Sequence, residues 1–184
     1  MTFWSSNKVE PKRSFRFLLE LTPQTGGKIA TYFIKTVKKP QFQMDGQAEV
    51  KYIQHTFKYP GRITWQPIDV TLLDPADPDS AAVMMNILRD SGYHKPDTPD
   101  NSKESISKSK ANKGMGAVFI RQIDAEGEKV SEWSLHNPFL TNVDFGSLGY
   151  DSDDIVEYTL TIDYDFATMW SKATKVSPGV GTGG

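Results

Sequence analysis

Histidine, cysteine and carboxylate side chains are the residues of a protein that most often bind metals or move protons. The chain has three histidines, His55, His94 and His136, and no two of them stand four residues apart, the spacing that puts two ligands on one face of a helix. Cysteine is absent, which excludes thiolate ligands, disulfides and a cysteine nucleophile. We therefore predict no metal site and no cofactor.

Aspartates cluster in two places along the chain. Asp151, Asp153 and Asp154 precede a segment of alternating apolar residues, and Asp163 and Asp165 end it. Calcium loops and glycosidase pairs use carboxylates, but aspartates before a strand are typical of a solvated turn. The chain also lacks a glycine-rich phosphate loop and a Gly-x-Ser-x-Gly nucleophile turn. The pattern favours a surface potential over catalysis, and we predict that the protein is not an enzyme.

Composition predicts one folded domain that does not bind nucleic acid tightly. The chain has 184 residues, of which 38% are hydrophobic and 24% charged, with a net charge of −2. This balance is enough to bury a core, and it offers no basic surface for many phosphates. No apolar run reaches the length of a membrane span. We expect a single domain over residues 1–170 and a flexible tail over residues 171–184, which lack packing side chains.

The segment 154–166 carries the clearest strand pattern, with side chains alternating between two faces. The apolar set predicts a core face made of Val156, Tyr158, Leu160 and Ile162, followed by Tyr164. The other set predicts a wet, acidic face made of Glu157, Thr159, Thr161 and Asp163.

Further strands are expected where apolar and β-branched residues alternate between turn signals. The segments are 14–22 and 28–37, interpreted as a hairpin, a long exposed hairpin over 40–59 with a turn signal at Asp45-Gly46, and 62–73, 117–124 and 129–135. In the segment 62–73, Ile68, Val70 and Leu72 are expected on one face, with Asp69 and Thr71 on the other.

One helix is expected between Asp77, as its N-cap, and Gly92. Its adjacent pair Met84-Met85 is interpreted as core filling rather than as a soft ligand. Residues 93–116, rich in serine and lysine, are interpreted as a long solvated loop. The predicted fold is mainly β: an antiparallel β-sandwich or barrel with one flanking α-helix.

A resemblance to a known family rests on residues 118–166, VFIRQIDAEGEKVSEWSLHNPFLTNVDFGSLGYDSDDIVEYTLTIDYDF. This stretch contains Arg121-Gln122 on a first strand, then Pro138, Thr141-Asn142-Val143 and a final strand that ends in Asp163-Tyr164. In order and spacing it resembles the tail tube proteins of T4-like, contractile-tailed bacteriophages. These share their fold with the tube proteins of type VI secretion.

The resemblance implies a structural protein of the inner tube of a contractile tail. Hexameric rings would stack into a hollow tube that conducts DNA during ejection. The implied partners are further copies of the chain, the tail sheath protein, baseplate and tape measure proteins, and double-stranded DNA in passage, with no membrane anchor. The implied location is the virion, and the host cytoplasm during assembly.

Two sets of residues take a role from this resemblance. The acidic strand face, Glu157, Thr159, Thr161 and Asp163, is a candidate for the lumen, where it would repel a passing polyanion. An ordinary solvent-facing surface explains the same alternation. The hairpin after the first strands is a candidate for stacking between rings, and so is the segment before Ser14. The candidate stacking residues of the hairpin are Phe42, Met44, Asp45, Gln47, Glu49 and Lys51.

Other interpretations stay open. The loop 93–116 and the glycine-rich tail depart from the family pattern, and a position facing the sheath is one interpretation of both. Within the fold, the chain could be a tube initiator, a terminator or a secretion-type tube protein. Outside it, a lectin-like β-sandwich binding module would need Trp65, Trp133, Tyr150 and Trp170 to be exposed together.

Overall fold

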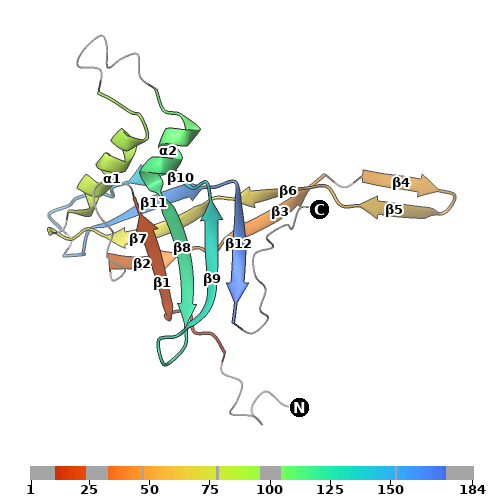
Figure 1. Ribbon diagram of the computed structural model, residues 1–184, viewed down its shortest axis with the longest axis horizontal. Coiled ribbons are helices and arrows are strands. Elements are labelled where there is room, and N and C mark those ends of the chain that lie inside the picture. The colour runs from red at the N-terminus through yellow and green to blue at the C-terminus, as the bar shows by residue number, and fades with distance from the viewer. Residues whose placement is uncertain are drawn as a thin grey trace, which may run out of the picture.

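The computed structural model describes residues 11–23, 33–46, 48–77, 79–95, 105–151 and 153–172. Two four-stranded antiparallel sheets pack against each other, two helices lie at one end, and a long hairpin projects from the body (Figure 1). The predicted mainly β, antiparallel fold is confirmed. Among the described residues, the helices are too short and too polar to span a membrane.

The first sheet, which we call the β8 sheet, has the strand order β1-β8-β9-β12. Its strands are β1 (Phe17–Thr22), β8 (Ala117–Ile123), β9 (Lys129–His136) and β12 (Phe166–Ser171). The two central strands follow one another in the chain and are joined by a tight turn at Gly127, where φ is +84°. The strands predicted at 117–124 and 129–135 are therefore confirmed.

The second sheet, which we call the β11 sheet, has the order β10-β11-β7-β2. Its strands are β2 (Ile34–Val37), β7 (Ile68–Leu73), β10 (Phe139–Asp144) and β11 (Glu157–Asp163). On β7 and β11 every second side chain is buried and the others are partly or fully exposed, the pattern predicted from the sequence. One face of this sheet therefore belongs to the core and the other to the outside.

The projecting hairpin, residues 41–66, extends β2 and β7 away from the body (Figure 1). Two ladders build it: β3 (Gln41–Asp45) with β6 (Arg62–Gln66), then β4 (Ala48–Tyr52) with β5 (His55–Tyr59). The chain reverses at Ile53-Gln54, since Tyr52 pairs with His55. The turn signal at Asp45-Gly46 is therefore not the hairpin turn: here the chain passes between two ladders, and Gly46 has a φ of +66°.

Two predicted strand assignments were wrong. Strand β1 pairs with β8 and β2 pairs with β7, so the segments 14–22 and 28–37 do not form a hairpin. The segment 154–166 is not one strand, because β11 ends at Asp163 and β12 begins at Phe166 in the other sheet. Apolar and polar residues continue to alternate through this crossover, so the sequence pattern did not show that the chain passes from one sheet to the other.

The core lies between the two sheets and is closed at one end by the helices. Leu160 and Ile162 have no exposed surface and Tyr158 has 2%. Val156 lies one residue before β11 and is half-buried, so it contributes less to the core than predicted. Further large, fully buried side chains come from both sheets and from both helices, among them Leu19, Leu21, Ile68, Val70, Leu72, Met84, Ile87, Met115 and Ile120.

Helix α1 (Ser80–Asp90) confirms the predicted helix, with Met84 and Ile87 on its buried face. The prediction that the methionine pair fills the core was wrong for Met85, which points away from that face and is about half exposed. Its N-cap is Asp79 rather than Asp77, and the Asp79 carboxylate accepts a hydrogen bond from the amide of Ala82 at 3.0 Å. At its other end Gly92, with a φ of +100°, follows the C-cap and ends the helix as predicted.

A second helix, α2 (Lys108–Met115), contradicts the prediction of one helix and of a solvated loop over 93–116. Its Ala111, Gly114 and Met115 are buried. A Cβ on Gly114 would meet the carbonyl oxygen of Ile87 at 3.0 Å, so glycine lets α2 approach α1 closely. Three small or apolar residues at helical spacing were the signal, and it was hidden in a lysine-rich segment.

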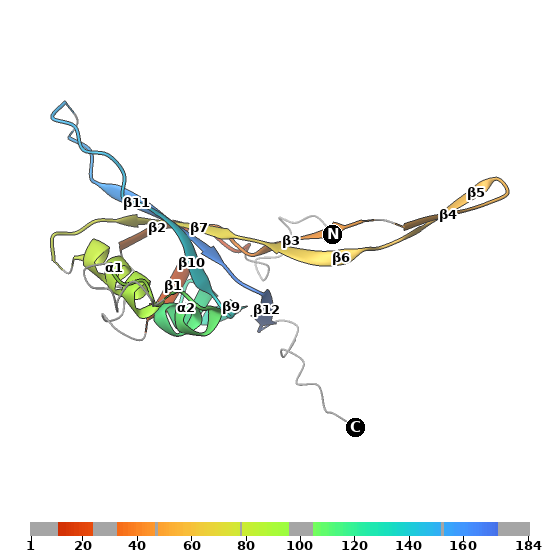
Figure 2. The same ribbon diagram turned by 90° about the horizontal axis from the view of Figure 1, so that it is seen from above.

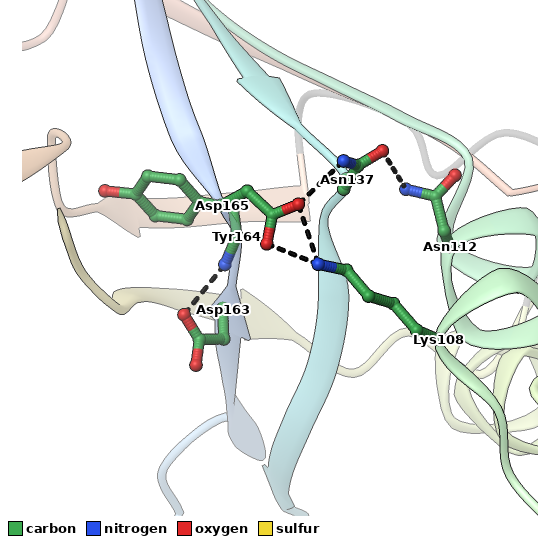
Figure 3. A network of polar contacts seen from close by, with 6 residues as sticks. All are labelled: Lys108, Asn112, Asn137, Asp163, Tyr164 and Asp165. Atoms are coloured by element: carbon green, nitrogen blue, oxygen red, sulfur yellow. Dashed lines mark hydrogen bonds and ion pairs between the residues drawn. The ribbon is translucent and has the colours of Figure 1, made fainter. Parts of the chain in front are cut away.

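A charged contact ties α2 to the crossover between the sheets (Figure 3). The ammonium of Lys108 donates to both carboxylate oxygens of Asp165, at 2.6 and 2.8 Å. The amide of Asn137 donates to Asp165 at 2.7 Å, and Asn112 donates to Asn137 at 3.4 Å. The hydrogen bonds from Lys108, followed by that from Asn137, lower the pKa of Asp165 below its usual value.

Leu160→Ala should lower the free energy of unfolding by about 2–5 kcal/mol, because it removes a fully buried side chain and leaves a cavity. Thr159→Ala, on the other face of the same strand, should change it by less than about 0.5 kcal/mol. Urea denaturation followed by circular dichroism measures both. Equal effects of the two substitutions would contradict the assignment of the two faces.

Asp165→Asn should make the free energy of unfolding less dependent on pH in the acid range. A carboxyl whose pKa is lowered on folding stabilises the fold above its unfolded pKa, about 3.9, and this contribution is lost as the pH falls through the folded pKa. Unfolding free energies measured between about pH 6 and about pH 2 test this. Asp77→Asn, at an exposed position, is the control. An unchanged profile in Asp165→Asn would contradict the role of this contact.

Candidate assembly interface

The two end strands of the β11 sheet offer unpaired backbone groups on opposite sides of the protein. In the described part of the chain, β10 is hydrogen-bonded only to β11, and β2 only to β7. Such free edges readily pair with a further strand. Because the two edges belong to one sheet and face in opposite directions, a copy added at one edge leaves the other edge free.

Apolar side chains line a hollow beside each of these edges. A hollow of about 250 Å³ lies between α1 and β10, and its apolar lining is Met84, Met85, Leu88, Leu140, Val143 and Phe145. A hollow of about 630 Å³ lies beside β2, with Phe15, Phe17, Val37 and Ile120 in its wall, together with Lys35 and Lys39. Each edge therefore combines free backbone groups with apolar surface that another chain could cover.

The outer face of the β11 sheet carries the four predicted lumen residues. Glu157, Thr159, Thr161 and Asp163 alternate with the core residues of β11, and all four are half-buried rather than fully exposed. On this face Lys35 contacts Glu157 at 2.5 Å, and Thr161 donates to Asp69 at 3.1 Å. These partners could not be found from the sequence, since Lys35 and Asp69 come from strands distant from β11 in the chain.

The charge of this face is mixed but acidic. Register places Asp144 opposite Thr159 and Asp69 opposite Thr161, so both carboxylates share the face with Glu157 and Asp163. Lys35 pairs with Glu157, and Lys38 lies 3.9 Å from Asp69. The lysines therefore offset part of the acidic charge that the strand alone suggested.

The projecting hairpin has its apolar side chains on one face of each ladder, where Met44 pairs with Ile63 and Val50 with Phe57. All described residues of β3, β4 and β5 are exposed. Its large exposed apolar residues are Phe42, Met44, Val50, Tyr52, Ile53, Phe57, Tyr59 and Ile63. A monomer in water rarely presents so much contiguous apolar surface unless another chain covers it. Of these residues, only Phe42 and Met44 were predicted from the sequence to have a role in stacking.

The predicted stacking residues lie along this hairpin. Phe42 and Met44 are about half exposed. The carboxylate of Asp45 accepts a hydrogen bond from Thr64 at 2.6 Å, and Glu49 lies 3.7 Å from the ammonium of Lys58. Lys51 is exposed on β4, and Gln47 lies outside the described residues.

Aromatic side chains fix the base of the hairpin to the body. Trp65 packs between Phe42 and Tyr164, with ring centroids 5.5 and 6.0 Å away. The hydroxyl of Tyr164 donates to the carbonyl oxygen of Gln66 at 2.9 Å. Burial raises the pKa of Tyr164 to about 12, so this donor keeps its proton at any physiological pH. The hairpin therefore leaves the body in a defined direction.

The outer face of the β8 sheet pairs its own charges. Arg121 on β8 contacts Glu20 on β1 and Glu132 on β9, so one guanidinium joins three strands. Its neighbour Gln122 is buried and accepts a hydrogen bond from Ser131 at 3.2 Å. These two residues, which the resemblance singled out, have structural roles in the sheet.

The four aromatic residues proposed for a binding module do not form one exposed group. Trp65 packs at the hairpin base, and Trp133 packs against the core. Trp170 lies beside the ammonium of Lys129, 4.5 Å from the ring centroid, and Tyr150 is fully exposed in the loop between β10 and β11. The described residues also contain no group of three metal-binding side chains.

Sequence comparison places this chain in no known family. No family model matches it, and no curated protein matches it. Comparison with solved structures, in contrast, finds proteins that share its fold.

Solved structures of contractile injection systems share the fold. A chain of the PVC sheath-tube complex in its extended state has a TM-score of 0.64 at 19% identity, covering 93% of this chain and 99% of that one. A chain of the PVC sheath/tube terminator in its extended state has 0.62 at 17%, covering 89% and 99%. The Hcp1 protein from E. coli EAEC 042 has 0.51 at 9%, covering 88% and 95%. The chain therefore has the tube-protein fold of contractile injection systems, which confirms the resemblance predicted from its sequence.

Proposed function

We propose that this protein is a structural, non-enzymatic tube subunit whose copies join edge to edge into rings. The observation that carries the proposal is the pair of free edges on the β11 sheet, each flanked by an apolar hollow. Pairing β10 of one copy with β2 of the next satisfies the backbone groups of both strands. A contact between two different surfaces, repeated around an axis, generates a closed ring when the rotation closes.

The ring has six subunits, and rings stack coaxially into a hollow tube. The number six comes from the resemblance to tail tube proteins, and the shared fold supports it. The tail sheath protein, baseplate proteins and a tape measure protein are the proposed partners of this tube. The tube belongs to a virion or to a phage-like injection particle, and its subunits are made in the host cytoplasm.

The outer face of the β11 sheet lines the channel of this tube. In a barrel closed through the sheet edges, one face of the sheet points to the axis and the other away from it. The core and the β8 sheet cover one face of the β11 sheet, so the face with Glu157, Thr159, Thr161 and Asp163 remains for the channel. Its surplus of carboxylates repels DNA phosphates during passage and keeps a polyanion from binding.

A terminator or initiator of the same tube is the second candidate. The likeness to a chain of the PVC sheath/tube terminator favours it as much as the likeness to the sheath-tube complex favours the tube itself. Copy number separates the two: a tube subunit occurs in many rings of each particle, whereas a terminator or initiator occurs in one.

Negative-stain electron microscopy across a concentration series should show six-fold rings, and tubes at higher concentration. Thr141→Lys places a charge in the hollow beside the free edge of β10 and should abolish the rings, because a lysine on an edge strand opposes pairing. Thr22→Lys, the same change at an exposed end of β1, is the control. Rings from Thr141→Lys at the wild-type concentration would contradict assembly through this edge.

Glu157→Lys combined with Asp163→Lys should slow DNA release from assembled particles, because the channel wall would then attract phosphates. Glu126→Lys combined with Glu128→Lys, in the turn between β8 and β9, makes the same charge change on the other sheet and serves as the control. The rate of DNA release from triggered particles measures the effect. Equal rates for the channel and control variants would exclude this face as the lumen.

A further inference from the structure

We infer that the tip of the projecting hairpin of one copy binds the loop between β10 and β11 of a copy in the next ring. The tip comprises residues 48–59, and the loop comprises residues 145–156, of which 145–151 and 153–156 are described. The inference rests on the proposed ring and names the surface that receives the hairpin.

Strand register sets the hairpin and the loop at opposite ends of the β11 sheet. Strands β7 and β11 pair with Ile68 opposite Ile162 and Leu73 opposite Glu157. The hairpin joins β7 at its Ile68 end, and the loop joins β11 at its Glu157 end. Both views agree, since the hairpin tip lies at one end of the long axis and the loop at the other (Figures 1 and 2).

Edge pairing turns these two ends into the two rims of a ring. Copies add along the direction of the backbone hydrogen bonds, which is perpendicular to the strands. The ends of the strands therefore point toward the two open rims of a closed barrel. Every hairpin tip then projects from one rim and every loop from the other, and coaxial stacking brings tips and loops face to face.

Both surfaces expose apolar side chains. Ile53 is 85% exposed at the tip, and Leu148 is 86% exposed in the loop. Tyr52 and Phe57 surround Ile53 in the chain, while Tyr150 and Ile155 accompany Leu148, and all of them are exposed. Covering such side chains against one another removes apolar area from water, which favours association.

The charges of the two surfaces are complementary. The tip carries Lys51 and Lys58 against the single acidic residue Glu49. The loop carries Asp151, Asp153 and Asp154 and has no lysine or arginine. Opposite charges at facing surfaces select the tip-to-loop contact over tip-to-tip or loop-to-loop contacts.

The backbone at the tip indicates that the side chain of Ile53 has a function. Ile53 has a φ of +55°, a conformation that β-branched residues rarely adopt and that glycine or asparagine adopts readily. A strained isoleucine, exposed at a two-residue hairpin turn, contributes little to the fold of a single copy. Binding of its side chain by another chain accounts for the presence of isoleucine there.

Ile53→Asn separates folding from stacking. Asparagine suits the backbone of the turn, so thermal stability should stay equal or rise. Rings should still form, but the concentration needed for tubes should increase by about tenfold or more, because one buried apolar side chain is worth that much in an equilibrium constant. Ile106→Asn, at an exposed isoleucine before α2, is the matched control and should form tubes as the wild type does.

A charge exchange tests the partner. Lys51→Glu should weaken stacking, as should Asp151→Lys combined with Asp153→Lys, and mixing these two variants should restore tubes with alternating contacts. Because the chain has no cysteine, disulfides report the contact directly. Gln54→Cys chains mixed with Ser147→Cys chains should cross-link in tubes, whereas Gln54→Cys with Glu126→Cys should not.

The outcomes separate this inference from the ring itself. Wild-type protein that forms neither rings nor tubes overturns both. Tubes of Ile53→Asn at the wild-type concentration, or tubes in which positions 54 and 147 do not cross-link, overturn the tip-to-loop contact and leave the ring intact. The contact is established if positions 54 and 147 cross-link in tubes and if Ile53→Asn forms rings but no tubes at the wild-type concentration.

Discussion

The unpaired backbone of the two end strands of the β11 sheet is the constraint on which the rest of this structure depends. An exposed strand edge in an isolated subunit is open to any passing strand. In this protein the two edges lie on opposite sides of one sheet, and each is flanked by apolar side chains. In the proposed ring, closure satisfies both edges of the β11 sheet in every copy at once.

The crossover from β11 to β12 holds the parts of the protein in place relative to one another. Tyr164 faces the hairpin base, where its hydroxyl binds the carbonyl of Gln66. The next residue, Asp165, binds Lys108 on the second helix (Figure 3). Two consecutive residues thus connect both sheets, the hairpin and α2, and they fix the hairpin direction on which the proposed stacking of rings depends.

Two exposed surfaces of the molecule differ in how their side chains are satisfied. The outer face of the β8 sheet pairs its charges within one copy, as the contacts of Arg121 with Glu20 and Glu132 show. The hairpin instead exposes a row of apolar residues on one face of each ladder, and a strained Ile53 lies at its tip. Association with another chain therefore stabilises the hairpin surface more than the β8 sheet face. Covering apolar area is favourable, whereas charges that are already paired on the surface contribute little.

The sequence by itself determined the class of fold, the two faces of β7 and β11, the buried face of α1, and the resemblance to tube proteins. Each of these depends on a local period or on a short ordered motif, which a single strand or helix displays. Tyr158, Leu160 and Ile162 could be assigned to one face of a strand without knowledge of their neighbours.

Only the tertiary structure decided which strands pair, where β11 ends, that α2 is a helix, and which surfaces are free. Strand pairing joins segments such as β1 and β8, about a hundred residues apart, and alternation does not specify a partner. The helix α2 depends on Met115 and Gly114 packing against α1, which a lysine-rich sequence conceals. The partners Lys35 and Asp69 on the candidate channel face, and the placement of tip and loop at opposite ends, follow from register, which exists only once the sheet has formed.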